Sequence, residues 1–338
     1  MTAKFTVGIV GQPMETLDLE EAVLGPEIRL VRLSGVREDD LDPAELGRLD
    51  ALLVWRMALG ARTANLLTRG RIVVRFSVGY DNIDVAAFTR AGIAFANNPD
   101  YGTEEVADSA MALILGLQRR IVEYDSRARG HTTTWQANIL PPVRRSRTLT
   151  VGVVGVGRIG TSVVNRLKPF GYHIAGFDPY QPSGHEKAIG YQRTESLNAL
   201  LAMADILTLH CPLTPETTGM IDTAAVERLK PGSILVNTAR GRLVADLDTI
   251  AAALRTGRLA AAGLDVLPDE PPRPHPLLDA WRRREDWLDG RLIITPHVAF
   301  YADEAWIEQR RKGCETARLC LVEGRLRNLI NPDDPASR

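Results

Sequence analysis

Residues 148–178 read TLTVGVVGVGRIGTSVVNRLKPFGYHIAGFD, and this stretch decides the fold. It holds an apolar strand-like run, the pattern G-x-G-x-x-G at 155–160, a helix-like segment and a second strand-like run that ends in Asp178. A strand, a glycine turn, a helix and an acid in this order are typical of a dinucleotide-binding unit. The glycines alone would be weak evidence, because glycines cluster in many loops.

Each part of this motif has a physical reason. Gly155 permits a tight turn, Gly157 lets the backbone approach a pyrophosphate at the helix N-terminus, and Gly160 lets helix and strand pack closely. Asp178 can accept hydrogen bonds from the adenosine ribose hydroxyls and repel a 2′-phosphate. The following residues PYQ (179–181) supply no cation for that phosphate. The motif therefore predicts NAD rather than NADP.

Short apolar runs alternate with helix-compatible segments along most of the chain. Continuous apolar runs predict parallel strands covered on both faces, and their alternation with helices predicts doubly wound α/β sheets. We expect strands at 5–10, 28–33, 50–55, 71–76, 92–97, 148–155, 172–178, 204–210, 232–239, 259–266 and 292–296. Helices are expected at 103–120, 158–170, 195–203, 222–229, 246–256 and 303–323, with a basic arm or loop at 125–148 and a short tail holding Pro332 and Pro335.

The composition excludes several classes of protein. The 338 residues are 45% hydrophobic, and 41 Lys and Arg against 42 Asp and Glu leave a net charge of −1, without the basic excess of a nucleic-acid binder. No apolar run approaches the roughly 18 residues of a membrane helix, and MTAKFTVGIVGQP (1–13) lacks the features of a secretory signal. Cys211, Cys314 and Cys320 are odd in number and lack metal-ligand spacing. We expect a cytoplasmic protein that binds no metal, nucleic acid or membrane.

Three chemically active side chains follow predicted strands of the second series. Arg240 follows the strand at 232–239, Glu270 lies in the loop after 259–266, and His297 follows 292–296. Ligands of open α/β sheets bind at the carboxyl ends of strands, so these residues are candidates for one site. A hydride transfer to a keto acid needs a cation for the carboxylate and carbonyl oxygen, a proton donor and a group that tunes the donor.

At this point the chain resembles the NAD-dependent D-2-hydroxyacid dehydrogenases over nearly its whole length. Six ordered motifs carry the resemblance: SVGYDNID (77–84), GVGRIG (155–160), LHCPLTPETTGMI (209–221), LKPGSILVNTARG (229–241), DVLPDEP (265–271) and TPH (295–297). The resemblance implies two doubly wound domains, a Rossmann cofactor domain at 102–297 and a flavodoxin-like substrate domain at 1–101 and 298–338, with a cleft between them. It also implies a homodimer formed through 103–148.

The resemblance assigns catalytic roles to the three side chains, and residue chemistry agrees with them. Arg240 would bind the substrate carboxylate and carbonyl oxygen. His297 would donate the proton in reduction and accept it in oxidation. Glu270 would hydrogen-bond the other ring nitrogen and favour the charged ring. Asp269 competes for that role, but the family spacing favours Glu270.

The resemblance further implies sets of cofactor and substrate contacts. The cofactor contacts are Val106, Gly155, Gly157, Arg158, Ile159, Gly160, Asp178, His210, Cys211, Pro212, Thr217, Thr238, Ala239, Arg240, Asp265 and His297. The substrate contacts are a backbone turn at Ser77, Val78 and Gly79 that binds the carboxylate, with Trp55, Arg56, Arg75, Arg240, His297 and Phe300.

One branch, that of the C-terminal-binding proteins, fits best in RFSVGYDNID (75–84), EEVADS (104–109), FDPY (177–180) and PHVAFYADEA (296–305). That branch carries an Arg where this chain has Arg75, but a Trp where this chain has Phe300, so its substrate does not carry over. Arg56 and Arg75 either face the distal end of the substrate or are surface charges.

These observations leave three functions open. The first is an NAD-dependent dehydrogenase of a D-2-hydroxy acid whose side chain the sequence does not identify. The second is an NAD-sensing scaffold for protein partners, and the third is a phosphoglycerate dehydrogenase that uses Arg56 and Arg75 on a phosphate. The charged stretch WRRREDW (281–287) is expected to form a solvated helix, with an acidic partner as the alternative.

Overall fold

The computed structural model describes residues 3–129, 135, 140 and 143–331. The chain divides into two compact units, one made of Met1–Gly102 with Ala302–Arg338 and the other of Thr103–Tyr301. Part of the expected arm at 125–148, including His131, and the tail with Pro332 and Pro335 lie outside the described residues. No helix of the described residues is both long and apolar enough to cross a membrane.

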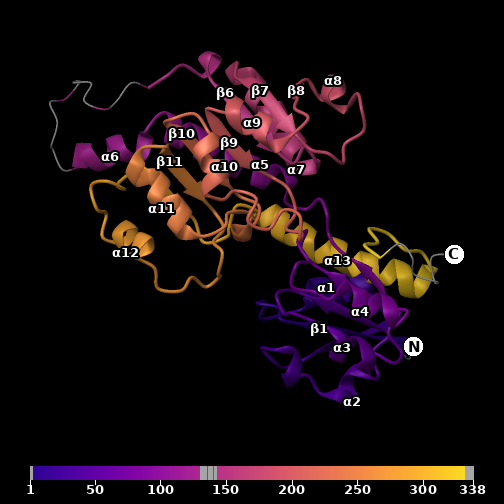
Figure 1. Ribbon diagram of the computed structural model, residues 1–338. Coiled ribbons are helices and arrows are strands. Elements are labelled where there is room, and N and C mark those ends of the chain that lie inside the picture. Colours follow the sequence, from indigo (N-terminus) through magenta and orange to yellow (C-terminus); the bar gives the residue numbers. More distant parts are fainter. Residues whose placement is uncertain (1–2, 130–134, 136–139, 141–142, 332–338) are drawn as a thin grey trace. The chain divides into compact units, whose positions relative to one another are not determined.

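The first unit is built on a parallel sheet of five strands (Figure 1). The strands are β1 (Phe5–Val10), β2 (Ile28–Arg32), β3 (Ala51–Val54), β4 (Ile72–Arg75) and β5 (Ala94–Ala96), in the spatial order β2-β1-β3-β4-β5. This is the flavodoxin-like order. The helices are α1 (Asp18–Leu24), α2 (Pro43–Leu46), α3 (Ala61–Leu66), α4 (Val85–Arg90) and α13 (Asp303–Glu323), with the 3-10 turn η1 (Glu38–Asp40).

Successive residues of these strands enter two different cores. Leu52 belongs to one buried cluster and Leu53 to the other, and both are fully buried. Both faces of the sheet are therefore covered, as continuous apolar runs require. The returning chain also joins the sheet edge, because the Asn331 side chain accepts a hydrogen bond from the Phe95 N–H at 2.7 Å.

The second unit is built on a parallel sheet of seven strands (Figure 1). The strands are β6 (Thr150–Val154), β7 (His173–Phe177), β8 (Gln192–Arg193), β9 (Ile206–Leu209), β10 (Ser233–Asn237), β11 (Leu259–Leu264) and β12 (Leu292–Ile294), in the order β12-β11-β10-β9-β6-β7-β8. Chain order reverses direction between β6 and β9, which is the switch point of a Rossmann-type sheet. Together the two sheets confirm the predicted α/β fold class.

The helices of this unit cover both faces of its sheet, because Leu235 enters one core while Ile234 and Val236 enter the other. They are α5 (Thr103–Gln118), α6 (Ile121–Arg129), α7 (Arg158–Leu167), α8 (His185–Ile189), α9 (Leu197–Met203), α10 (Thr223–Arg228), α11 (Leu247–Thr256) and α12 (Pro276–Arg282), with 3-10 turns η2 (Ser146–Thr148), η3 (Lys168–Phe170) and η4 (Gly241–Leu243).

Two helical segments, and the short strand β8, differ from the expectation. The start of the expected arm is the helix α6, separated from α5 by Arg120 in the left-handed region (φ 56°). The expected helix over 281–287 is also wrong, because α12 ends at Arg282 and Arg284 has a φ of 53°. Trp287 is anchored instead, with the Arg255 guanidinium 3.9 Å from its ring centroid. Both breaks depend on left-handed residues that are not glycine, which the sequence pattern does not reveal.

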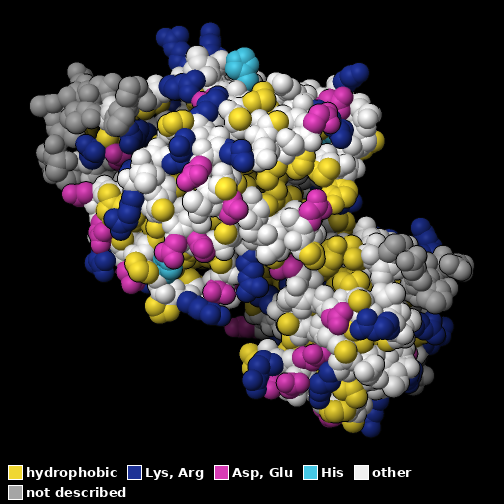
Figure 2. Space-filling model, in the orientation of Figure 1, with side chains coloured by type: hydrophobic (Ala, Val, Ile, Leu, Met, Phe, Trp, Pro, Cys, Tyr) yellow, Lys and Arg dark blue, Asp and Glu magenta, His cyan; other side chains and the backbone are white. Residues whose placement is uncertain are grey.

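Charges of both signs are mixed over the visible face of the molecule (Figure 2). Lys and Arg side chains alternate there with Asp and Glu, as the nearly neutral composition predicts. The described residues of that face therefore present no broad field of one sign that would attract a polyanion.

A buried ion pair fixes α13 to the first unit, and we expect its loss to destabilise that unit. The Glu20 carboxylate is fully buried and accepts hydrogen bonds from Arg310 Nε at 2.6 Å and Nη2 at 2.7 Å. Glu20→Ala should lower the free energy of unfolding by about 3–5 kcal/mol, because the Arg310 charge stays buried without its partner. Urea denaturation measures the loss. Arg311→Ala, which removes an exposed pair on the same helix, should cost about 1 kcal/mol or less; equal losses would contradict the prediction.

Candidate active site

The glycine loop between β6 and α7 has the packing that its sequence predicts. Gly155 has a φ of +82°, and a Cβ there would lie 2.7 Å from the Cys211 backbone nitrogen. A Cβ on Gly160 would lie 2.0 Å from the Gly155 carbonyl oxygen. Gly157, which precedes the first residue of α7, has no atom near its Cβ position. Two glycines therefore allow close packing, and the third leaves open space in front of a helix N-terminus, where a pyrophosphate fits.

The residues next to the glycine loop occupy the first turn of α7. Arg158 is exposed, and Ile159 is half-buried against the core. Val106, another expected cofactor contact, is 8% exposed on α5, a helix that packs against α7. Arg158 and Ile159 thus lie at the start of α7, and Val106 lies on the neighbouring helix α5.

The Asp178 carboxylate joins the glycine loop to the loop after β7. Its Oδ2 accepts a hydrogen bond from Val156 N at 2.8 Å, and its Oδ1 accepts one from Tyr180 N at 3.0 Å. Each carboxylate oxygen has a second lone pair, so the group can still accept from a ribose hydroxyl. The residues present therefore fit the adenosine half of NAD.

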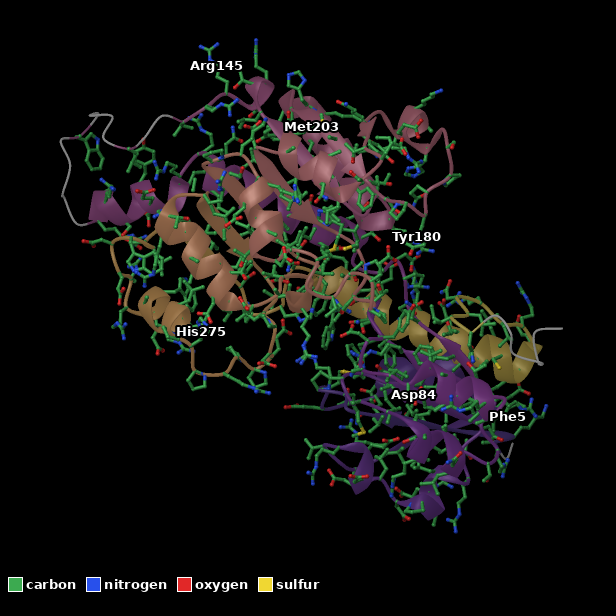
Figure 3. The ribbon with its side chains drawn as sticks, in the orientation of Figure 1. Phe5, Asp84, Arg145, Tyr180, Met203 and His275 are labelled. Carbon is green, nitrogen blue, oxygen red and sulfur yellow. The ribbon has the colours of Figure 1, made fainter. Side chains whose placement is uncertain are left out.

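The surroundings of Asp178 supply more negative charge. Tyr180, labelled in Figure 3, donates its phenolic hydrogen to Glu216, and this hydrogen bond together with the Glu216 charge raises the pKa of Tyr180. The one cation of β8, Arg193, donates to the carbonyls of Gln181 at 3.1 Å and Pro182 at 3.4 Å. The Arg193 guanidinium is therefore engaged by the backbone rather than directed to a phosphate.

His210 and Cys211, which follow β9, are half-buried and have pKa values far from neutral pH. His210 lies with Nε2 2.9 Å from the Thr208 hydroxyl, and burial lowers the pKa of His210 to about 3. Burial also raises the pKa of Cys211 to about 12. His210 is therefore a neutral ring at neutral pH, and Cys211 is not a thiolate nucleophile.

The remaining expected cofactor contacts follow β9 and β10. Thr217 closes its loop by donating to the Pro212 carbonyl at 2.7 Å. Ala239 N donates to the Asn237 side chain at 3.0 Å. Thr238 is buried, and its hydroxyl has no hydrogen-bond partner among the residues that the structure describes. Such a hydroxyl remains available to a ligand or a bound water.

His297 and Glu270 form the central polar contact of the site. His297 Nδ1 lies 2.6 Å from Glu270 Oε2, and Glu270 Oε1 accepts from Leu267 N at 3.0 Å. The imidazole side chain is 43% exposed, so its second nitrogen can meet a substrate. This contact leaves Nε2 as the nitrogen available for proton transfer.

Glu270 is ionised in this environment. Burial opposes its ionisation, yet the pKa of Glu270 lies below its ordinary value. The hydrogen bond and charge of the His297 ring lower it first, and the Leu267 N–H and the Arg240 charge lower it further. The carboxylate is thus the anionic partner of the imidazole.

Arg240 is held beside the loop that carries Glu270. Its backbone carbonyl accepts from the Asn237 amide at 2.8 Å, and its Nη1 donates to the Ala239 carbonyl at 2.8 Å. A Cβ on Gly241 would lie 2.0 Å from the Leu267 backbone, so the loops after β10 and β11 are in direct contact. The structure therefore brings Arg240, Glu270 and His297 together within one unit.

The second acid of that loop faces elsewhere. Asp269 lies 3.6 Å from Arg242 Nη2 and 3.3 Å from Arg273 Nε. Of the two adjacent acids, Glu270 contacts the His297 ring in this structure, in agreement with the family spacing.

Asp265, expected as a cofactor contact, is only 2% exposed and directs its carboxylate to residues 295–299. It accepts hydrogen bonds from Val298 N and Ala299 N, each at 3.0 Å. These bonds join residues 298–301 to the second unit, and the first unit resumes at Ala302 rather than at 298. The sequence reasoning missed Thr295, whose hydroxyl donates to Asp265 at 2.6 Å.

The expected carboxylate-binding turn lies after β4 in the first unit. The backbone N–H groups of Ser77, Val78 and Gly79 donate to no residue among those described. The Val78 carbonyl accepts from the Asn97 side chain at 2.7 Å, and the Gly79 carbonyl accepts from Arg75 Nε at 3.3 Å. Backbone N–H groups that no described residue uses make this turn a candidate anion-binding surface.

The Arg75 side chain is buried and contacts the turn that follows β4. It is 8% exposed, and its Nε donates to the Ser77 hydroxyl at 2.9 Å and to the Gly79 carbonyl at 3.3 Å. Because two of its contacts lie in the turn after β4, Arg75 stabilises that turn. The sequence predicts either a substrate contact or a surface charge for Arg75, and not this structural role.

Trp55 and Arg56, which follow β3, differ in exposure. Trp55 is 4% exposed and stacks on Phe76, with ring centroids 4.8 Å apart. Its indole N–H has no partner among the described residues. Arg56 is exposed, and its guanidinium makes no ion pair within the part of the chain that the structure describes. Phe300 belongs to the second unit and is half-buried.

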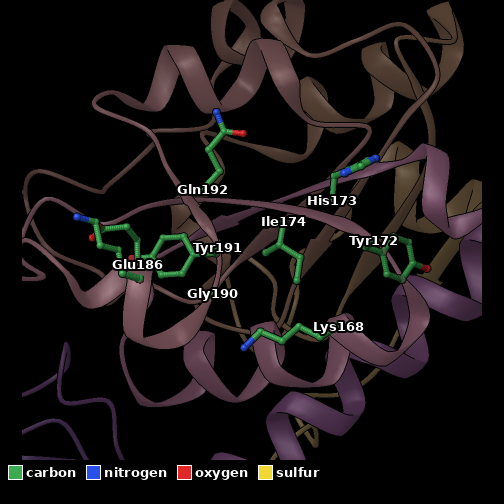
Figure 4. A pocket seen from close by; sticks show the side chains of 9 residues that line it. Lys168, Tyr172, His173, Ile174, Glu186, Gly190, Tyr191 and Gln192 are labelled. Atoms are coloured by element: carbon green, nitrogen blue, oxygen red, sulfur yellow. The ribbon is translucent and has the colours of Figure 1, made fainter.

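A shallow pocket of about 590 Å³ lies away from these residues. Figure 4 shows it beside Lys168, His173 and Gln192. His173 begins β7, whereas Asp178 follows the end of that strand. The pocket is therefore at the opposite end of β7 from the candidate cofactor site.

Comparisons with known sequences agree with this geometry. Residues 111–299 match the family model described as D-isomer specific 2-hydroxyacid dehydrogenase, NAD binding domain. The D-3-phosphoglycerate dehydrogenase of Mycobacterium leprae is 35% identical over 313 residues, which are 92% of this chain and 56% of the relative. That of Mycobacterium tuberculosis H37Rv is 36% identical over 302 residues, 89% of this chain and 54% of the relative. The chain spans about half the length of these curated relatives.

Solved structures of similar proteins cover nearly the whole chain. A D-lactate dehydrogenase from Aquifex aeolicus, complexed with NAD and lactic acid, has a TM-score of 0.82 at 26% identity and covers 96% of this chain and 99% of its own. A glyoxylate reductase from Paecilomyes thermophila has a TM-score of 0.83 at 25% identity and covers 98% of this chain and 99% of its own.

These matches correct the expected branch and support the expected family. The curated relatives matched above are phosphoglycerate dehydrogenases, so the expected placement in the branch of the C-terminal-binding proteins is not supported. The family model covers more than half of the chain, and it includes the glycine loop and the His297 loop. The chain belongs to the D-isomer specific 2-hydroxyacid dehydrogenases, a family of NAD-binding enzymes.

Proposed function

We propose that this protein interconverts a 2-keto acid and a D-2-hydroxy acid with NAD(H). The observation that carries the proposal is the 2.6 Å contact between His297 and Glu270, beside the loop that holds Arg240. A half-exposed imidazole with an anionic partner and a neighbouring guanidinium is the set of groups that carbonyl reduction needs.

Each side chain has a distinct task in the proposed reaction. Arg240 pairs with the substrate carboxylate and draws negative charge toward the carbonyl oxygen. His297 Nε2 gives its proton to that oxygen in reduction and takes it back in oxidation. Glu270 keeps the ring oriented through Nδ1 and stabilises the charged form. NADH, when bound at the glycine loop and Asp178, supplies the hydride to the carbonyl carbon.

The substrate is proposed to carry a second anionic group, such as a distal carboxylate or phosphate. The exposed Arg56 guanidinium supports this, because it makes no ion pair among the described residues. The phosphoglycerate dehydrogenases matched above support a phosphate in particular. Arg75 supports it less, since its side chain holds the 77–79 turn.

The chain is also proposed to act as a homodimer in a reducing compartment. The helix α6 exposes Ile121, Val122 and Tyr124, apolar surface that a second copy could cover. Cys211, Cys314 and Cys320 are all free thiols. No contact described above favours the scaffold alternative, because a scaffold does not need a half-exposed His297–Glu270 pair.

We expect NADH to be the better cofactor because Asp178 repels a 2′-phosphate. Asp178→Asn removes the negative charge but keeps an oxygen that can accept from the Val156 N–H. The ratio of kcat/KM with NADH to kcat/KM with NADPH should therefore fall by about tenfold or more, which is the usual contribution of one charged hydrogen bond. The measurement is kcat/KM with NADH and NADPH. Glu227→Gln, an exposed carboxylate of α10, is the control and should change nothing. A wild-type preference for NADPH would contradict the assignment.

His297→Gln should retain NADH binding and lower kcat by about 10²–10⁴, the usual contribution of a positioned acid. Stopped-flow single turnovers and fluorescence titration with NADH separate the two effects. A variant with the wild-type rate would show that another group moves the proton.

Glu270→Gln should shift the pH dependence of reduction to lower pH. The neutral amide no longer favours the charged ring, so less His297 is protonated at a given pH and the rate falls earlier as the pH rises. The depressed pKa of Glu270 means that its contribution to stability is complete at neutral pH and is lost as the pH falls through that pKa. Rate profiles between pH 5 and 9 test the shift, and Asp269→Asn, the adjacent acid, should leave them in place.

Arg56→Ala should weaken turnover of 2-keto acids with a distal anion selectively. The loss in kcat/KM should correspond to about 1.5–3 kcal/mol for a charged hydrogen bond, while matched apolar 2-keto acids lose little. Arg48→Ala, another exposed arginine of the first unit, is the control. Arg75→Ala should weaken both substrates alike, because it loosens the 77–79 turn. Equal losses for both substrates in Arg56→Ala would refute a distal anion.

A further inference from the structure

The loop that carries His297 is fixed by one buried carboxylate. Asp265 Oδ1 accepts hydrogen bonds from the Thr295 hydroxyl at 2.6 Å and from Val298 N at 3.0 Å, and its Oδ2 accepts from Ala299 N at 3.0 Å. The side chain of Asp265 is almost inaccessible to solvent. Bonds to a buried charged acceptor are stronger than neutral ones, so these three contacts hold both ends of a short loop.

His297 needs this support because its backbone is in an unfavourable conformation. Its φ is +55°, in the left-handed region that a residue with a Cβ enters at a cost. The His297 N–H donates to the backbone carbonyl of Asp265 at 2.8 Å, and that bond exists only while the turn keeps this shape. Such a backbone persists only when the surrounding contacts determine it.

The opposite side of the same loop is held by α5. Ser109 donates its hydroxyl to the Ala299 carbonyl at 3.0 Å. Ala299 is thus bound through its N–H by Asp265 and through its carbonyl by Ser109. The ring of His297 projects from the middle of a loop whose neighbours are fixed on both sides.

We infer that Thr295 is a positioning residue for the reaction, acting through Asp265 to set the direction of the His297 ring against Glu270. This inference rests on the proposed function for its kinetic consequences, but the geometry that carries it does not. A hydroxyl at this position completes the carboxylate's set of donors, and a methyl group of the same size cannot. Small displacements of a proton donor cost large factors in rate.

Thr295→Val, which is nearly isosteric, tests the inference against Thr295→Ser, which keeps the hydroxyl. In Thr295→Val, kcat should fall by about 10- to 100-fold, the cost of misplacing a reacting group by about 1 Å. KM for NADH should stay within about twofold of the wild-type value, and Thr295→Ser should restore most of the rate. Ser233→Ala, a buried hydroxyl at the start of β10, is the control.

A second measurement separates positioning from stability and from the proposed function. The ring signals of His297, assigned by their loss in His297→Gln, are followed by NMR against pH in the wild type and in Thr295→Val. The charged groups that act on this ring are Glu270, which contacts it, and Arg240, which acts on Glu270. A loosened loop should weaken the contact with Glu270 and move the titration midpoint, whereas a purely structural loss would leave it in place. Ser109→Ala should move it in the same direction if Thr295→Val does not fold.

The outcomes are distinct. A shifted midpoint with reduced kcat supports the inference. A shifted midpoint in a protein that reduces no 2-keto acid supports the positioning role and refutes the proposed function. A normal kcat and an unshifted midpoint in Thr295→Val would overturn the inference, as would a loss of kcat that only follows a loss of folded protein.

Discussion

Every strand of the larger sheet runs in the same direction, and this constraint decides where chemistry can occur. Parallel strands place all their carboxyl ends at one edge, where helix N-termini also begin. The glycine loop, Asp178, His210, Arg240 and the His297 loop each follow a strand of this sheet. Groups far apart in sequence therefore meet at a single edge without any local motif that joins them.

That edge combines tight packing with open space. Gly160 and Gly241 allow backbones to touch where any side chain would collide, whereas Gly157 faces nothing. Burial also removes competing chemistry, because His210 stays neutral and Cys211 stays protonated. The half-exposed His297–Glu270 pair, in contrast to His210 and Cys211, is poised to exchange a proton.

Much of the fold was predictable because it depends on local patterns. Apolar runs located all of the long strands, and the glycine motif located the turn between β6 and α7, since both arise from short-range sterics and burial. The sequence analysis did not predict the short strand β8 or the helix α6, and it placed the end of α12 wrongly. They depend on left-handed residues such as Arg120 and Arg284 and on contacts that only the folded chain creates.

In the candidate site, residue type and position predicted which side chains take part, whereas only the structure shows where those side chains point. Arg240, Glu270 and His297 were candidates because their chemistry and their places after strands are visible in sequence. The direction of a side chain is not visible: Arg75 turns toward its own loop, and Asp265 turns its carboxylate away from solvent toward Thr295.

The buried carboxylate of Asp265 and the half-exposed carboxylate of Glu270 come from one short segment, yet they do different work. Asp265 is bound by hydrogen bonds from the backbone and a hydroxyl, so its charge is used to fix the loop. Glu270 keeps one oxygen for the His297 ring, so its charge acts on a group that can change protonation. Rigidity of the backbone and responsiveness of the ring are thus supplied by separate acids, and this separation lets a strained histidine turn hold its geometry while the imidazole exchanges a proton.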